Sequence, residues 1–235
     1  MPHIRHSKRF FNEPDVHYVE GDVVTNSILD EIRSWLAPLN KRILNHPYIS
    51  EAEKGDLPLG KVEAFVANQY YIIDHDARSL ALMASRSKSV DEFEFFNTIL
   101  NGDAEALPLL IKMSTALGWG LRDLDDYTPI PEAVVYSHYL TSLAHFASPG
   151  EQAMALIVNL PVWGSNCKRL SRALKDNYGM EETSFLDIFA RPMAESEEAA
   201  LSVINRYLNE KKCMRKAARL VQAYELMFWN GIYGG

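Results

Sequence analysis

Apolar residues recur at steps of three and four along most of this chain, which is the spacing that places them on one face of an α-helix. The pattern is clear between Lys61 and Arg86, a segment without glycine or proline. Pro58 stands just before it, and proline suits the first turn of a helix, since the N–H groups of that turn have no partner within the helix. The apolar face of this predicted helix contains Val62, Phe65, Val66, Ile72, Ile73, Leu80 and Met83, and it also carries two polar residues, Gln69 and Asp76.

Similar patterns predict further helices, although proline interrupts three of them. Pro38 is expected to kink or split the first, Gly102 and Pro108 punctuate the segment 90–118, and Pro161 lies inside another. Residues 121–131 are expected to form a loop, and His46 is expected to cap a helix end. The predicted helices cover residues 22–44, 90–118, 133–147, 151–176, 184–189, 195–208 and 214–229.

No segment alternates between apolar and polar residues with a period of two, so we expect no β-sheet. The pattern instead predicts one all-α domain of about seven to nine helices over residues 23–235. Residues 1–22 follow no period and are expected to form an irregular N-terminal arm.

The net charge and the cysteine content indicate which binding partners and which cellular compartment the protein is expected to have. The 24 Lys and Arg against 31 Asp and Glu leave a formal net charge of −7, which disfavours a nucleic-acid-binding face because such a face needs clustered basic residues. The N-terminus lacks the apolar stretch of a signal peptide, and no run reaches the roughly eighteen apolar residues of a membrane span. Two isolated cysteines, Cys167 and Cys213, suggest a reducing compartment. We expect a cytoplasmic protein that binds neither nucleic acid nor membranes.

Several polar groups stand within otherwise apolar patterns, where they cost free energy unless they are satisfied. Gln69 and Asp76 are two turns apart on one predicted helix, and they either line a pocket or belong to a buried network. Glu225 lies in the apolar run YELMFW. Burial would raise its pKa and suit it to proton transfer, unless a Lys or Arg of another helix pairs with it. Tyr136 and Tyr139 suit either the core or a pocket wall.

Familiar catalytic and metal-binding motifs are absent. The chain contains no GxGxxG, GxxxxGK[ST], GxSxG or HExxH sequence. The carboxylates beside His75 are Asp74 and Asp76, and as direct neighbours of the histidine they point to different faces of a helix. We therefore expect no metal and no cofactor.

Four segments, taken in order, resemble the TenA (thiaminase II) family and its relatives. They read HPYI…GDLPLGKVEAFVANQYYII, YSHYLTSLA, NLPVWGSNC and YELMFW, and they lie within residues 40–232. The resemblance implies a haem-oxygenase-like helical bundle that assembles as a homodimer or larger homo-oligomer and binds a small heteroaromatic molecule. It places Glu225 on the family's catalytic glutamate and Tyr136 on a pocket tyrosine.

The chain departs from the family pattern at several positions. Gln69 falls where the family has a substrate-binding aspartate, and Ser165 falls on a pocket tyrosine. Pro161 occupies the place of the nucleophilic cysteine, and Cys167 lies about one turn beyond Trp163. The cysteine of the family's reaction is therefore missing from its usual position.

Three functions follow as hypotheses. The first is hydrolysis of a thiamin-related aminopyrimidine, with Glu225 as the acid and base. In this hypothesis the substrate-binding residues are Gln69, Asp76, Tyr136, Tyr139, Trp163 and Ser165. The second is an oxidase of the PqqC or CADD type acting on a small aromatic or quinone precursor, because the segment FVANQYY also resembles a sequence motif of PqqC. The third is a non-catalytic binder of small molecules.

Overall fold

The computed structural model describes residues 27–191 and 194–234, and helices are the only regular secondary structure in this part of the chain. This confirms the all-α prediction. The predicted irregular arm of residues 1–22 lies outside the described residues. The helices are α1 (Ile28–Leu44), α2 (Pro47–Lys54), α3 (Leu59–Ser85), α4 (Val90–Ala116), α5 (Leu121–Asp126), α6 (Pro131–Phe146), α7 (Pro149–Tyr178), α8 (Ser184–Phe189), α9 (Ala194–Asn205) and α10 (Lys211–Gly234), with a 3₁₀ turn at Leu208–Glu210.

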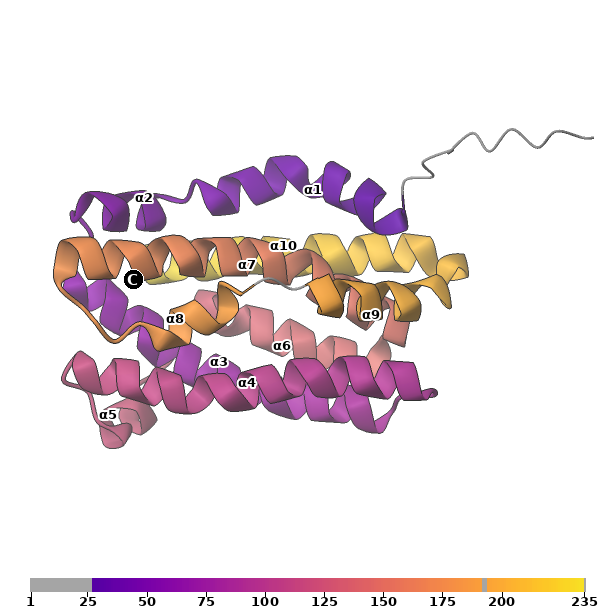
Figure 1. Ribbon diagram of the computed structural model, residues 1–235, viewed down its shortest axis with the longest axis horizontal. Coiled ribbons are helices and arrows are strands. Elements are labelled where there is room, and N and C mark those ends of the chain that lie inside the picture. The colour runs from indigo at the N-terminus through magenta and orange to yellow at the C-terminus, as the bar shows by residue number, and fades with distance from the viewer. Residues whose placement is uncertain (1–26, 192–193, 235) are drawn as a thin grey trace, which may run out of the picture.

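The long helices run along the long axis of the bundle (Figure 1). In the described residues α3 packs on α4 and α6, and α10 packs on α6 and α7. Helices α1 and α2 lie along α7 and α10 on one side, whereas the short helices α8 and α9 bridge α7 and α4. The centre of the bundle is therefore enclosed by helices that are far apart in the sequence.

Helix starts follow local capping chemistry. Helix α1 begins at Ile28, where Ser27 and Asp30 form a capping box, and the predicted start at residue 22 lies outside the described residues. The expected loop over residues 121–131 contains a short helix, α5, and its Asp123 carboxylate accepts the N–H of Gly120 at 2.8 Å. His46 caps the start of α2, as predicted, by accepting the N–H of Tyr48 at 3.2 Å.

Helices α1, α4 and α7 each continue through an internal proline. The first helix continues through the exposed Pro38 to Leu44, so the expected split does not occur. In α7, Pro161 has no N–H to donate to the carbonyl of Ile157. The guanidinium of Arg33 donates to that carbonyl at 3.3 Å, and Arg33 is itself held by Glu197 of α9 at 2.7 Å. Thus α1 and α9 compensate for a proline in the longest helix.

Packed aromatic rings from α2, α3, α7 and the C-terminal part of α10 fill the core at one end of the bundle. The ring of Trp229 lies 5.4 Å from that of Tyr48, 6.1 Å from Phe65 and 5.7 Å from Trp163, measured between centroids. Offset and edge-on contacts of this kind add to the free energy gained by burying the rings. Trp163 therefore stands between the solid aromatic core and the middle of the bundle.

Gly164 allows α8 to approach α7 closely. A Cβ atom at this position would lie only 2.4 Å from the carbonyl oxygen of Phe189, which is backbone and cannot rotate away. The glycine therefore fixes the position of Phe189 and of the chain that follows it.

We expect Gly164→Ala to destabilise the protein by about 1–3 kcal/mol, because the added methyl group overpacks the contact between α7 and α8. An ordinary glycine-to-alanine change in a helix has the opposite sign, stabilising by about 1 kcal/mol. Urea unfolding measures the difference. The neighbouring exposed residue supplies the control, Ser165→Ala, which should change the free energy of unfolding little. An increase in stability for Gly164→Ala would contradict this account.

Candidate active site

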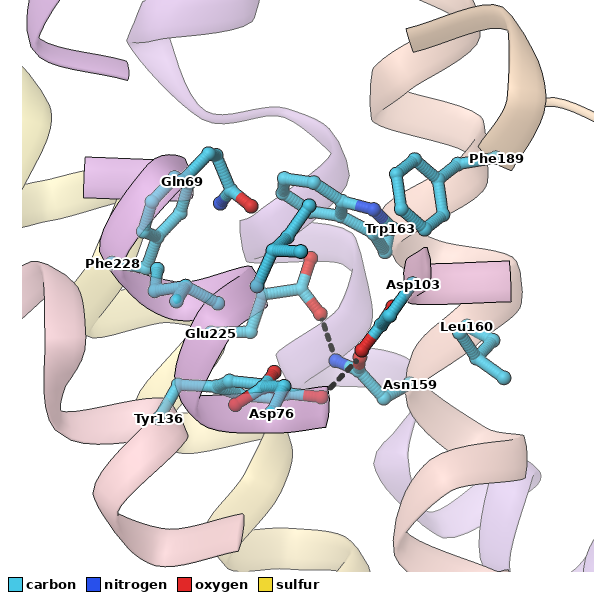
Figure 2. Close-up of a pocket in the computed structure, with 12 residues that line it drawn as sticks. Gln69, Asp76, Asp103, Tyr136, Asn159, Leu160, Trp163, Phe189, Glu225 and Phe228 are labelled. Atoms are coloured by element: carbon cyan, nitrogen blue, oxygen red, sulfur yellow. Dashed lines mark hydrogen bonds between the residues drawn. The ribbon is translucent and has the colours of Figure 1, made fainter. Parts of the chain in front are cut away.

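Six helices surround a cavity of about 70 Å³ in the middle of the bundle (Figure 2). Its walls combine aromatic and aliphatic side chains with carboxyl, amide and phenol groups, which is the composition of a small-molecule site. The lining residues are Gln69, Ile72, Ile73, Asp76, Asp103, Tyr136, Asn159, Leu160, Trp163, Phe189, Glu225 and Phe228.

Glu225 of α10 is 3% exposed and presents its carboxyl to this cavity. The indole N–H of Trp229, one turn later on the same helix, donates to Oε1 at 3.3 Å. The side-chain amide of Asn159 donates to Oε2. Burial outweighs these two donors and raises the pKa of Glu225 to about 8. Near neutral pH the group is therefore largely protonated and can both give and take a proton.

Asn159 of α7 joins Glu225 to other helices through every polar atom of its side chain. Besides Glu225, its amide N–H₂ donates to Oε1 of Gln222 at 2.9 Å. Its Oδ1 accepts the hydroxyl of Tyr136 at 3.1 Å (Figure 2). Gln222 in turn donates to Oδ1 of Asn40 on α1 at 2.6 Å. Because both the N–H₂ group and Oδ1 of Asn159 form hydrogen bonds, the amide has one favourable orientation. In that orientation it holds the side chains of Glu225 and Tyr136 in place.

Two further carboxyl groups share the cavity. Asp76 of α3 accepts the hydroxyl of Ser137 at 2.5 Å, and burial raises its pKa to about 7. Asp103 of α4 remains partly exposed to solvent and makes no hydrogen bond to the described residues. Desolvation together with the charge of Asp76 raises its pKa above the ordinary value. The side chains of Asp76, Asp103 and Glu225 reach into the same space from three helices (Figure 2).

Asp103 was not among the sequence-predicted site residues. The sequence feature that could have identified Asp103 is the one that identified Asp76, a polar residue on the apolar face of a helix. Asp103 lies at helical spacing from Phe96, Ile99 and Leu110. The adjacent Gly102 does not interrupt the helix, since α4 continues through it to Ala116.

The remaining walls are apolar, apart from Gln69. The indole of Trp163 lies edge-on to Phe228 and Phe189, with centroid distances of 5.8 Å and 5.9 Å. Gln69 of α3 is 5% exposed, and its amide makes no hydrogen bond to any described residue. A planar ligand could stack on the aromatic wall and pair with this amide.

The structure brings together five of the seven sequence-predicted site residues: Gln69, Asp76, Tyr136, Trp163 and Glu225. Tyr139 does not line this cavity, and its ring packs against Tyr224 with centroids 5.1 Å apart. Ser165 is exposed and faces a separate surface hollow. It lies two residues after Trp163, and a step of two places side chains on different sides of a helix.

Neither cysteine lies at the cavity. Cys167 is fully buried, and burial raises the pKa of its thiol well above the ordinary value, which makes it a weak nucleophile. Cys213 is exposed on the first turn of α10. Within the described residues, no group of His, Cys, Asp and Glu is arranged to hold a metal ion. The same residues include no helix that combines the length and the apolar character needed to span a membrane.

Comparison with known protein families agrees with the fold. The model of the TENA/THI-4/PQQC family matches residues 33–235. The chain belongs to this family. The resemblance inferred from the sequence is therefore confirmed.

Solved structures show the same fold at low sequence identity. A TenA homologue from Pyrococcus furiosus is 22% identical and superposes with a TM-score of 0.72 over 88% of this chain and 100% of its own. A putative TenA-like thiaminase from Sulfolobus solfataricus is 14% identical, with a TM-score of 0.70 and coverages of 87% and 94%. A domain of unknown function from Shewanella denitrificans with a heme oxygenase-like fold is 14% identical, with a TM-score of 0.75 and coverages of 88% and 92%. No curated protein matches the sequence.

We expect Asp76→Asn to change how stability depends on pH. Because the folded state raises the pKa of Asp76 from 3.8 to about 7, its stabilising contribution is fully present below the unfolded value and is lost as the pH rises through about 7. Between the unfolded and the folded pKa, the free energy of unfolding of the wild type should fall, relative to that of the variant, by up to about 1.4 kcal/mol per pH unit. Asn keeps the oxygen that accepts the Ser137 hydroxyl.

Urea unfolding of both proteins between about pH 4 and pH 9 measures this difference. The exposed Glu105 on α4 supplies the control, Glu105→Gln, which should run parallel to the wild type. A constant difference between Asp76→Asn and the wild type across the range would show that Asp76 does not titrate in this window.

Proposed function

We propose that the protein hydrolyses the amino group of a small, thiamin-related aminopyrimidine held in this cavity. The observation that carries the proposal is the buried Glu225 carboxyl, which faces a partly aromatic cavity and has a pKa of about 8. Membership of the TENA/THI-4/PQQC family and the similarity to a putative TenA-like thiaminase support the substrate class.

The aromatic wall and the amide of Gln69 would hold the pyrimidine ring. Stacking on Trp163 and edge contacts with Phe189 and Phe228 suit a flat heteroaromatic ring. The side-chain amide of Gln69 offers one donor and one acceptor, which match the ring nitrogen and amino group along one edge of an aminopyrimidine. Tyr136 already donates its proton to Asn159, so its oxygen serves as an acceptor for the ligand.

Water is the nucleophile in this proposal, because neither cysteine lies at the cavity. Protonated Glu225 gives its proton to a ring nitrogen, and the carboxylate then takes a proton from the water whose oxygen attacks the carbon bearing the amino group. Glu225 returns this proton to the amine, the C–N bond breaks and ammonia leaves. Loss of the hydroxyl proton to Glu225 forms the pyrimidinone and restores the acid, so one water is consumed for each ammonia released.

Self-association and a cytoplasmic location are also proposals. The sequence resemblance supports a homo-oligomer. The two isolated cysteines support a location in the cytoplasm.

We expect Glu225→Gln to lower kcat for release of ammonia from a 4-amino-2-methylpyrimidine substrate by about 100-fold or more, because the variant can no longer move a proton. A coupled ammonia assay measures the rate, and Glu105→Gln on the surface should behave as the wild type. An unchanged rate in Glu225→Gln would remove this residue from the mechanism. A ligand-dependent rise in Tm without ammonia release from the wild type would instead indicate a binding protein.

A further inference from the structure

The cavity is not equally sealed on all sides. Most of its lining side chains are buried, and the ones that remain partly exposed to solvent are Asp103, Tyr136, Leu160, Trp163 and Phe189. Three of these, Asp103, Leu160 and Phe189, lie together on one side of the cavity (Figure 2). They come from α4, α7 and α8, so the weakest part of the wall lies where these three helices meet.

A second hollow of about 200 Å³ lies directly outside this part of the wall. Asp103, Leu160 and Phe189 line both the cavity and this outer hollow. Side chains that line two spaces are the whole thickness of the wall between them. Displacement of one such side chain would therefore join the cavity to the outer hollow.

Phe189 has a fixed backbone and a side chain that can rotate. Its carbonyl oxygen packs against α7, where a Cβ atom at Gly164 would lie only 2.4 Å away. Its ring packs edge-on against Trp163 and Phe185, with centroid distances of 5.9 Å and 5.3 Å. Rotation about the side-chain bonds, between staggered rotamers, would move the ring while the backbone of α8 stays in place.

Gly102 of α4 leaves the outer hollow open. It lines this hollow, and a Cβ atom at its position would meet no other heavy atom within 4 Å. Its φ angle is not positive and α4 continues through it, so the backbone does not require a glycine here. Glycine costs about 1 kcal/mol relative to alanine inside a helix. Its effect at this position is to keep free space beside Asp103.

We propose that small molecules enter and leave the cavity through the outer hollow, between α4 and α8, and that the ring of Phe189 is the gate. Asp103 and Leu160 form the other edges of this entrance. The inference goes beyond the proposed function, because it concerns access to the cavity and holds for whatever reaction takes place inside.

Another surface hollow, of about 380 Å³, offers an alternative route. It shares Leu160 and Phe189 with the cavity and is also lined by Ser165. This hollow does not reach Asp103, so it shares less of the wall than the hollow beside Gly102 does. A bulky side chain placed in each hollow in turn distinguishes the two routes.

Labelling of a thiol inside the cavity tests the entrance without a natural ligand. Ile73→Cys places a thiol on the part of the cavity wall that α3 forms, and Ile73 lines neither outer hollow. Cys213→Ser removes the exposed native thiol. The probe is methyl methanethiosulfonate, and mass spectrometry of the digested protein follows each cysteine separately. Native Cys167 is fully buried and does not line the cavity, so its labelling reports unfolding of the protein.

In this background, Phe189→Ala should speed labelling of the introduced thiol by about tenfold or more, because the gate is removed. Gly102→Trp should slow it by about tenfold or more, because the indole fills the outer hollow. Ser165→Trp, which fills the alternative hollow, should leave the rate unchanged. In every variant Cys167 should react far more slowly than the introduced thiol.

An unchanged rate in either Phe189→Ala or Gly102→Trp would overturn the proposal, and so would slower labelling in Ser165→Trp. Equal labelling rates for the introduced thiol and Cys167 would also overturn it, since the cavity would then be reached only by unfolding. These rates do not depend on catalysis. Absence of ammonia release would therefore reject the proposed hydrolysis and leave the entrance supported.

Discussion

Burial of the Glu225 carboxyl against Asn159 and Trp229 is the constraint on which the centre of this bundle depends. A carboxyl group removed from water is costly unless donors reach both of its oxygens, and here they come from α7 and from the next turn of α10. Asn159 cannot turn without losing Gln222 and Tyr136 as well. The network thus couples α1, α6, α7 and α10, and it keeps a polar group facing a space that apolar packing would otherwise close.

The three acids of the cavity differ in their surroundings, and these differences divide their roles. Glu225 accepts two hydrogen bonds from N–H donors, Asp76 accepts one from a hydroxyl, and Asp103 accepts none from the described residues. All three have a raised pKa because burial penalises the charged form. A firmly held carboxyl suits directed proton transfer, whereas carboxyl groups with free acceptor atoms suit ligand recognition.

The cavity wall depends on two compensations in α7 that lie close together in sequence. Arg33 donates to the carbonyl of Ile157 in place of the N–H that Pro161 lacks. Gly164 has no side chain, so the backbone of Phe189 can pack directly against it. Between these two sites Trp163 turns into the cavity, where Phe189 meets its ring edge-on. Pro161 and Gly164, which are both unusual inside a helix, therefore flank the part of α7 that positions the aromatic wall of the cavity.

Local patterns by themselves determined the helical class, most helix positions and the polar residues within apolar stripes, because helical spacing and buried polarity are properties of short segments. They identified Gln69, Asp76 and Glu225, and the same reasoning could have identified Asp103. Only the tertiary structure decided which of these share one space, since α3, α4 and α10 meet through packing that no single segment encodes. It also placed Tyr139 against Tyr224 and supplied Arg33 to a proline more than a hundred residues away. Such outcomes depend on the relative rotation and approach of whole helices, and those are set by the core as a unit.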